Sequence, residues 1–119
     1  MKATIGLFFA ATTAVLAAQP VSGTWRNSGL TLVLQISGTS VTGSVKDGAA
    51  ATHIIKEGSV DGNAVRFTTD AVLNGNNVVL QWEGVTRSDE LTLMRWVAGT
   101  PRNQPYAPFN GPFVLRRLD

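Results

Sequence analysis

The chain has 119 residues, of which 44% are hydrophobic and 15% charged, with a formal net charge of +2. This length suits a single domain, the balance of residues excludes a disordered chain, and the lack of a basic cluster gives no indication of nucleic-acid binding. Cysteine is absent, which excludes disulfides, thiolate metal sites and a lipoprotein anchor and leaves the hydrophobic core to hold the fold.

The N-terminal segment, residues 1–18, has the pattern of a secretory signal peptide. Lys2 precedes a charge-free apolar run that ends in the small residues Ala17 and Ala18. This order of a cation, an apolar run and small residues is typical of a cleaved export signal. We therefore expect a mature domain over 19–119 in the periplasm or outside the cell. The alternative is an uncleaved membrane anchor, which the threonines and alanines of the run disfavour.

The rest of the chain has the pattern of short strands joined by tight turns. In the stretch 30–37, leucine or isoleucine occupies every second position and alternates with other residues, which predicts a strand with one dry face. Further strands are expected over residues 23–25, 41–45, 53–60, 65–70, 78–85, 91–96 and 113–118. About eight strands without a helical segment predict an all-β, antiparallel up-and-down meander that closes, or nearly closes, into a barrel. A β-sandwich is the alternative.

Two features of this pattern concern the shape of the wall. The stretch 53–60 changes its alternation midway, and a bulge near Lys56 and Glu57 would restore it. Glycines at positions 43, 58 and 84 fall on the inner faces of their strands, where a missing side chain permits the sharp coiling that closure requires.

The first strand, the strand order and a late arginine together resemble the calycin-type barrels, which include the lipocalins and the avidin group. The residues that carry the resemblance are Gly23-Thr24-Trp25 on the first strand and an arginine on a terminal strand. In those families this tryptophan closes one barrel end and the arginine packs across it. The resemblance implies that role for Trp25, with either Arg117 or Arg95 over the ring. No spaced Trp and Asp set for biotin is present, so no avidin ligand residue is carried over.

A second likeness comes from the run 55–63, with its Gly-Ser-Val-Asp-Gly-Asn core, which resembles small exported bacterial β domains of unassigned function.

The chemistry-bearing residues are few. His53 is the sole histidine, and without a second histidine or a cysteine a transition-metal site would need distant carboxylates. The carboxylates show no pairing suited to glycoside hydrolysis, and no triad motif is present. We therefore predict no catalytic residue, metal or cofactor. An enzyme of hydrolase type using His53, Glu57 and Arg95 is the third and weakest functional hypothesis.

Arg95 stands at an inner position between Leu93 and Val97, where a lone cation would be costly. Three roles are open for it. It caps Trp25, it pairs with Asp70 or Glu83, or it binds an anionic ligand.

The Pro-rich link over 99–112 is the one long connection, and it carries Tyr106 and Phe109. Links of this length without their own structure are often functional. It serves either as a lid over a barrel mouth or as a strap over apolar surface.

The leading functional hypothesis is an exported, non-catalytic module that binds a small apolar or amphipathic ligand inside the barrel. Its expected ligand-binding residues are Phe67, Trp82, Arg95, Tyr106 and Phe109. The alternative is a plugged barrel that binds a protein partner, as an inhibitor does, through an apolar patch formed by Met94, Trp96, Tyr106 and Phe109. No nucleic-acid partner is expected, and a membrane is involved only through an uncleaved signal segment.

Overall fold

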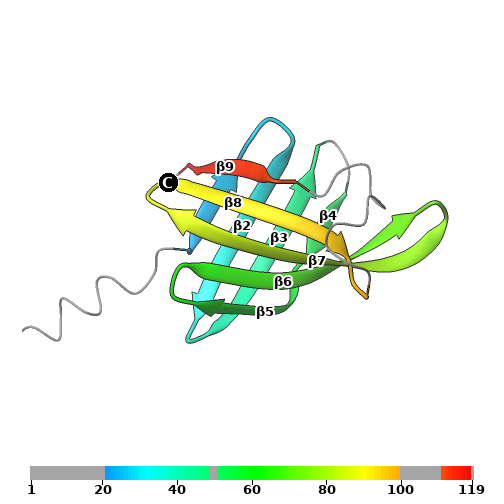
Figure 1. Cartoon of the computed structure of the whole chain (residues 1–119), viewed down its shortest axis with the longest axis horizontal. Helices are drawn as coiled ribbons and strands as arrows, with labels where there is room; N and C mark the ends of the chain where they lie inside the picture. The colour runs from blue at the N-terminus through cyan, green and yellow to red at the C-terminus, as the bar shows by residue number, and fades with distance from the viewer. Residues whose placement is uncertain (1–20, 49–50, 100–110, 119) are drawn as a thin grey trace, which may run out of the picture.

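The computed structural model describes residues 21–48, 51–99 and 111–118. The described strands are β1 (Gly23–Arg26), β2 (Leu30–Ser37), β3 (Ser40–Asp47), β4 (Thr52–Ile54), β5 (Lys56–Asp61), β6 (Ala64–Leu73), β7 (Asn76–Arg87), β8 (Glu90–Val97) and β9 (Phe113–Arg117) (Figure 1). Within the described ranges, no helix is long and apolar enough to cross a membrane. The expected signal peptide and most of the 99–112 link lie outside them.

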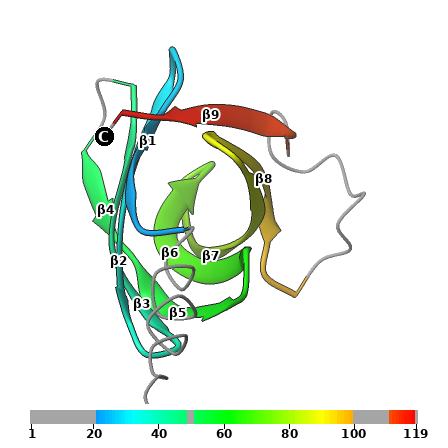
Figure 2. The ribbon, with the colours of Figure 1, turned by 90° about the vertical axis from the view of Figure 1, so that its left-hand side faces the viewer.

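Eight of the described strands close into an antiparallel barrel (Figure 2). Their order around the wall is β2-β1-β9-β8-β7-β6-β5-β3, and an additional β2–β3 pairing completes the ring. The extra strand, β4, pairs with β3 alone among the described strands, next to the part of β3 that pairs with β5. The predicted all-β barrel is confirmed, and the sandwich alternative is wrong. The architecture is compatible with a calycin-like fold.

The alternating sequence places the inner and outer faces as expected. In β7, Leu80 and Trp82 are buried, whereas Val79 and Val85 are exposed. In β2, Leu32 and Leu34 are buried in the same way. Because neighbouring side chains of a strand point to opposite faces, each such strand contributes one apolar wall to the interior.

The stretch predicted as one strand over 53–60 forms β4 and β5, which are separated at Ile55, and a bulge lies within β5. The register against β6 shifts between Lys56 and Ser59, and Glu57 has a positive φ of 50°. An extra residue of this kind reverses the face that the following side chains take. Ile55 before the bulge and Val60 after it therefore both pack with the core. The predicted bulge is confirmed.

Two glycines allow close approach between neighbouring strands. A Cβ on Gly43 would lie 1.8 Å from the Val33 carbonyl oxygen, and the backbone there has a φ of 144°. A Cβ on Gly58 would lie 2.4 Å from the Val41 carbonyl oxygen. Both separations are far below van der Waals contact, so the missing side chains let β3 bend against β2 and β5.

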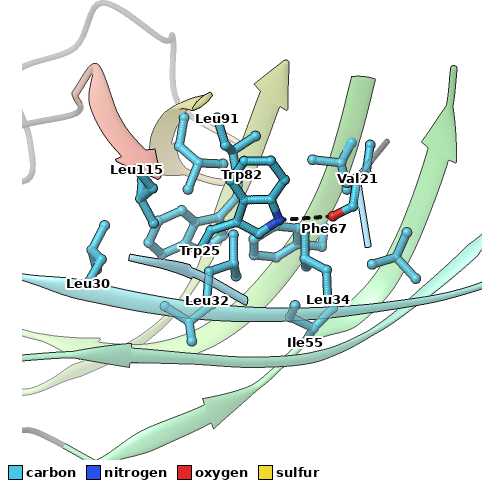
Figure 3. Packing of buried hydrophobic residues seen from close by; sticks show 14 of the residues in the cluster. Val21, Trp25, Leu30, Leu32, Leu34, Ile55, Phe67, Trp82, Leu91 and Leu115 are labelled. Atoms are coloured by element: carbon cyan, nitrogen blue, oxygen red, sulfur yellow. Dashed lines mark hydrogen bonds between the residues drawn. The ribbon is translucent and has the colours of Figure 1, made fainter. Parts of the chain in front are cut away.

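The hydrophobic core fills the part of the barrel shown in Figure 3. Its buried members are Val21, Trp25, Leu30, Leu32, Leu34, Val41, Val45, Ile55, Val65, Phe67, Leu80, Trp82, Leu91, Leu93, Val97 and Leu115. The Phe67 and Trp82 rings stack at the centre with 5.6 Å between centroids and 16° between planes. The two residues are direct partners on β6 and β7, so their rings pack side by side on the inner face of these strands.

Arg117 lies over the ring of the buried Trp25. The Trp25 indole nitrogen donates a 2.9 Å hydrogen bond to the Val21 carbonyl oxygen (Figure 3). The Arg117 guanidinium carbon lies 4.2 Å from the Trp25 ring centroid, and its Nη1 donates to the Ser22 carbonyl oxygen. A cation over an indole is favourable and holds both groups in place. Arg117, and not Arg95, therefore lies over Trp25.

The β6–β7 hairpin extends beyond the strands on both sides of it (Figure 1). Its ladder continues out to the pair Leu73 and Asn76, whereas β5 pairs with β6 only as far as Thr68 and β8 pairs with β7 only as far as Leu80. The strands expected over 65–70 and 78–85 are therefore longer than predicted, because their pairing continues up to a two-residue Asn-Gly link, which is a favoured hairpin turn. Among the described strands, the outer parts of β6 and β7 thus pair only with each other.

Gly43→Ala tests the close approach of β3 to β2. The added methyl would meet the Val33 carbonyl in a strained conformation, so we expect a loss of roughly 3 kcal/mol or more in the free energy of unfolding. Gly29→Ala is the matched control, because its Cβ would meet nothing closer than 3.8 Å, and we expect a change below about 1 kcal/mol. Urea denaturation measures both, and equal effects would refute the account of β3.

Arg117→Lys tests the contact of Arg117 with Trp25. Lysine keeps the charge but loses the flat guanidinium over Trp25 and its fork of donors, so we expect a loss of about 1–2 kcal/mol in stability. Arg116→Lys is the matched control, because Arg116 is exposed and pairs with Glu90 at 3.0 Å, a surface pair worth less than about 1 kcal/mol. Thermal unfolding that ranks the two variants the other way would contradict the assignment of Arg117.

Candidate functional site

A cavity of about 1000 Å³ lies at the barrel end away from the Arg117 contact. β9 begins opposite Leu93 and ends at Arg117, and Arg95 continues β8 in the direction away from Arg117. The described apolar lining comprises Val45, Ala51, Ala71, Val72, Leu73, Val78, Val79, Leu80 and Trp82. The described polar lining comprises Asp47, His53, Thr69, Asp70, Asn77 and Arg95.

Unequal strand lengths create this hollow. The outer part of β6 has no strand partner on its β4 side among the described residues, and β4 pairs with β3 instead. By the alternation of an antiparallel ladder, the backbone groups of Asp70 and Val72 point away from β7 toward this gap. The cavity lies between the walls that separate here.

The stacked aromatic pair forms the floor of the cavity. Trp82 is buried but lines the cavity, whereas Phe67 is completely buried and does not contribute to the lining. The Trp82 indole nitrogen donates a 3.0 Å hydrogen bond to the Thr69 hydroxyl, so its polar atom is satisfied and its ring presents an apolar surface. Trp82 therefore contributes an apolar ring to the floor, beside the Arg95 guanidinium.

Arg95 carries the positive charge of the site. Its guanidinium carbon lies 5.2 Å from the Trp82 ring centroid and 5.0 Å from that of Phe113. Its Nη1 lies 3.3 Å from the Asp47 carboxylate at the end of β3. The two rings and the carboxylate offset the cost of holding a cation at an inner position. The expected role in which Arg95 caps Trp25 is wrong, because Arg117 lies over that ring.

A second ion pair stands where β5 and β6 begin to separate. Lys56 Nζ lies 2.6 Å from the Asp70 carboxylate, and the Thr68 hydroxyl donates to the Lys56 carbonyl oxygen at 3.1 Å. The hydrogen bond to Asp70, and then its negative charge, raise the pKa of the Lys56 ammonium above its ordinary value of 10.5. Lys56 and Thr68 form the last pair of the β5–β6 ladder at this end.

The structure brings some predicted site residues together and separates others. Trp82 and Arg95 line the cavity, and Phe67 stacks against Trp82 without lining it. Tyr106 and Phe109 lie outside the described residues.

Sequence reasoning missed Asp47, which lies beyond the strand expected over 41–45, and the apolar wall of Ala71, Leu73 and Val78. The signal that could have found this wall is its period-two alternation, because Ala71 and Leu73 continue the inner face of β6 after Thr69.

The hypothesis of an exposed apolar patch loses one of its members. Trp96 is only 8% exposed and Met94 is half-buried. The expectation that Trp96 contributes an exposed ring to a partner surface is therefore wrong.

Two of the three residues named in the enzyme hypothesis line the cavity. His53 and Arg95 line it, but Glu57 stands on the bulge and is not part of the lining. In the part of the chain that the structure describes, no group of three or more His, Cys, Asp or Glu side chains is placed to hold a metal ion.

No family model matches the chain, and neither a curated protein nor a solved structure shows significant similarity to it.

The Lys56–Asp70 pair predicts a pH dependence at the alkaline end. Because the folded-state pKa of Lys56 is raised, the pair's contribution to stability is complete below 10.5 and is lost as pH rises through the folded-state pKa. We expect the stability difference between the wild type and Asp70→Asn to shrink over that window. Chemical denaturation at several pH values measures it, with an NMR titration of the lysine ammonium as a check. A difference that stays constant to the highest pH would contradict the pair's role.

Proposed function

We propose that the protein is a non-catalytic binding module that takes a small apolar or amphipathic ligand into the cavity at the open end of its barrel. The observation that carries the proposal is the half-filled interior. Trp25, Phe67 and Trp82 pack one part of the barrel, while the other part leaves about 1000 Å³ with mostly apolar walls. Cavities of this size and lining, with a few polar groups that fix orientation, are typical of small-molecule sites.

We also propose an exported setting and a calycin-type relationship. The signal-like residues 1–18 support export, and the contact of Arg117 with Trp25 supports the relationship because it matches the barrel-end arrangement of that group. The mass of the mature chain recovered from the periplasm tests the first point. An intact N-terminus in the cytoplasm would overturn it.

The protein-partner alternative has less support. A plugged barrel needs a filled interior and an exposed apolar patch, whereas this barrel is filled at one end only and Trp96 is buried. The enzyme alternative has less support again, because Glu57 stands apart from His53 and Arg95.

Ala71→Phe tests whether the cavity is the binding site. Ala71 is half-buried on the inner face of β6 and lines the cavity. A phenyl ring there fills the space that a ligand needs, so we expect the neutral fluorescent probe N-phenyl-1-naphthylamine to bind at least about tenfold more weakly, a change of about 1.4 kcal/mol. A fluorescence titration of the probe measures the affinity.

Ala64→Phe is the matched control, because it makes the same change at an exposed position of the same strand. Ala64 borders a second, smaller hollow of about 370 Å³. If Ala64→Phe weakens the probe and Ala71→Phe does not, the probe binds in that second hollow and the proposal is wrong. An absence of any probe binding to the wild type would also count against it.

A further inference from the structure

The charges of the cavity are arranged by depth. The Arg95 side chain is 12% exposed, whereas the carboxylates of Asp47 and Asp70 are 50% and 63% exposed. The positive charge is therefore the inner one, and the negative charges lie toward solvent. A group that reaches the floor meets a cation in a poorly hydrated place, where its attraction for an anion is strongest.

The two aromatic rings hold the Arg95 guanidinium in a fixed place. Trp82 and Phe113 stand on the strands that flank β8, and each ring centroid lies within about 5 Å of the guanidinium carbon. A cation that is held by rings keeps its position when its counter-ion is exchanged. Arg95 is thus a preorganised anchor, which lowers the cost of binding a ligand.

Asp47 is a counter-ion that comes from a strand not adjacent to β8 and contacts Arg95 only weakly. It reaches Arg95 from the end of β3, and β3 and β8 are not neighbours in the barrel wall. The contact is 3.3 Å between Arg95 Nη1 and Asp47 Oδ2, which is long for a charge-assisted hydrogen bond of about 2.7–2.9 Å. Because the Asp47 carboxylate is half-exposed, water can hydrate it fully when it leaves Arg95.

We propose that Arg95 binds the carboxylate head of a single-chain amphipathic ligand, and that Asp47 is an internal competitor which this head displaces. The inference rests on the proposed function and names its ligand class. A carboxylate already occupies the position beside Arg95, so the site accommodates that headgroup. The head lies at the floor and the tail points outward along the hairpin.

The tail path follows the inner face of β7. From Trp82 through Leu80 to Val78 is four residues, or about 13 Å of extended strand. Leu73 continues this wall near the hairpin tip. An alkyl chain of medium length fits the path with its head beside Arg95.

Three amphiphiles with the same tail and different heads test the proposal: decanoate, decanol and decyltrimethylammonium. We expect decanoate to bind about tenfold more tightly than decanol, and the ammonium compound to bind most weakly. Displacement of N-phenyl-1-naphthylamine from the full chain measures all three affinities. The preference for decanoate should decrease as salt is raised.

Two variants separate the competitor from the anchor. Asp47→Asn removes the competing charge, so we expect decanoate to bind about threefold to tenfold more tightly while decanol is unchanged. Asp61→Asn makes the same change of net charge at the exposed end of β5, outside the lining of the cavity, and should alter neither affinity. Arg95→Gln should abolish the preference for decanoate. If that variant does not fold, Asp47→Asn still decides the question because its side chain is half-exposed.

The outcomes separate this proposal from the one it rests on. Equal affinities for decanoate and decanol, with no gain in Asp47→Asn, would overturn the assignment of Arg95 and Asp47 while leaving a ligand-binding cavity in place. A failure of all three amphiphiles to bind would overturn both proposals.

Discussion

The stack of Phe67 on Trp82 determines how the interior of this barrel is used. An eight-stranded barrel is just wide enough for side chains to fill it, so a single aromatic layer can divide it in two. The Phe67 and Trp82 rings form this layer, with 5.6 Å between their centroids. On one side the core packs around Trp25, over which Arg117 lies. On the other side the ring of Trp82 lines a cavity.

The hollow side depends on strands that differ in length. β6 and β7 extend past β5 and β8, and β4 pairs with β3 and not with β6. Strand pairing holds the wall up to Lys56 and Thr68, where the Lys56–Asp70 ion pair adds a contact. Beyond that point the walls separate. The barrel therefore opens where the chain passes from β4, which pairs with β3, to β5, which pairs with β6.

Local patterns predicted the walls of the barrel but not the pairings across it. Period-two alternation placed Leu32, Leu80 and Trp82 inside, and the change of alternation near Lys56 located the bulge, because these features depend only on neighbouring residues. The contact of Asp47 with Arg95 joins strands far apart in sequence, and no local pattern encodes it.

The length of the β6–β7 hairpin was missed for a different reason. Asparagines and a glycine around Asn74 are typical of a longer turn, yet they sit at the tip of a regular ladder. The choice between Arg95 and Arg117 as the partner of Trp25 also needed the strand register, since both arginines lie on inner faces of late strands.

The central claim is that the cavity of the barrel holds a ligand. Native mass spectrometry of the full chain, purified without detergent from the cells that make it, tests this most directly. We expect the protein to carry a small non-covalent adduct, which is lost on gentle activation and is absent in Ala71→Phe. A bare chain mass in both proteins, under conditions that keep the barrel folded, would contradict it.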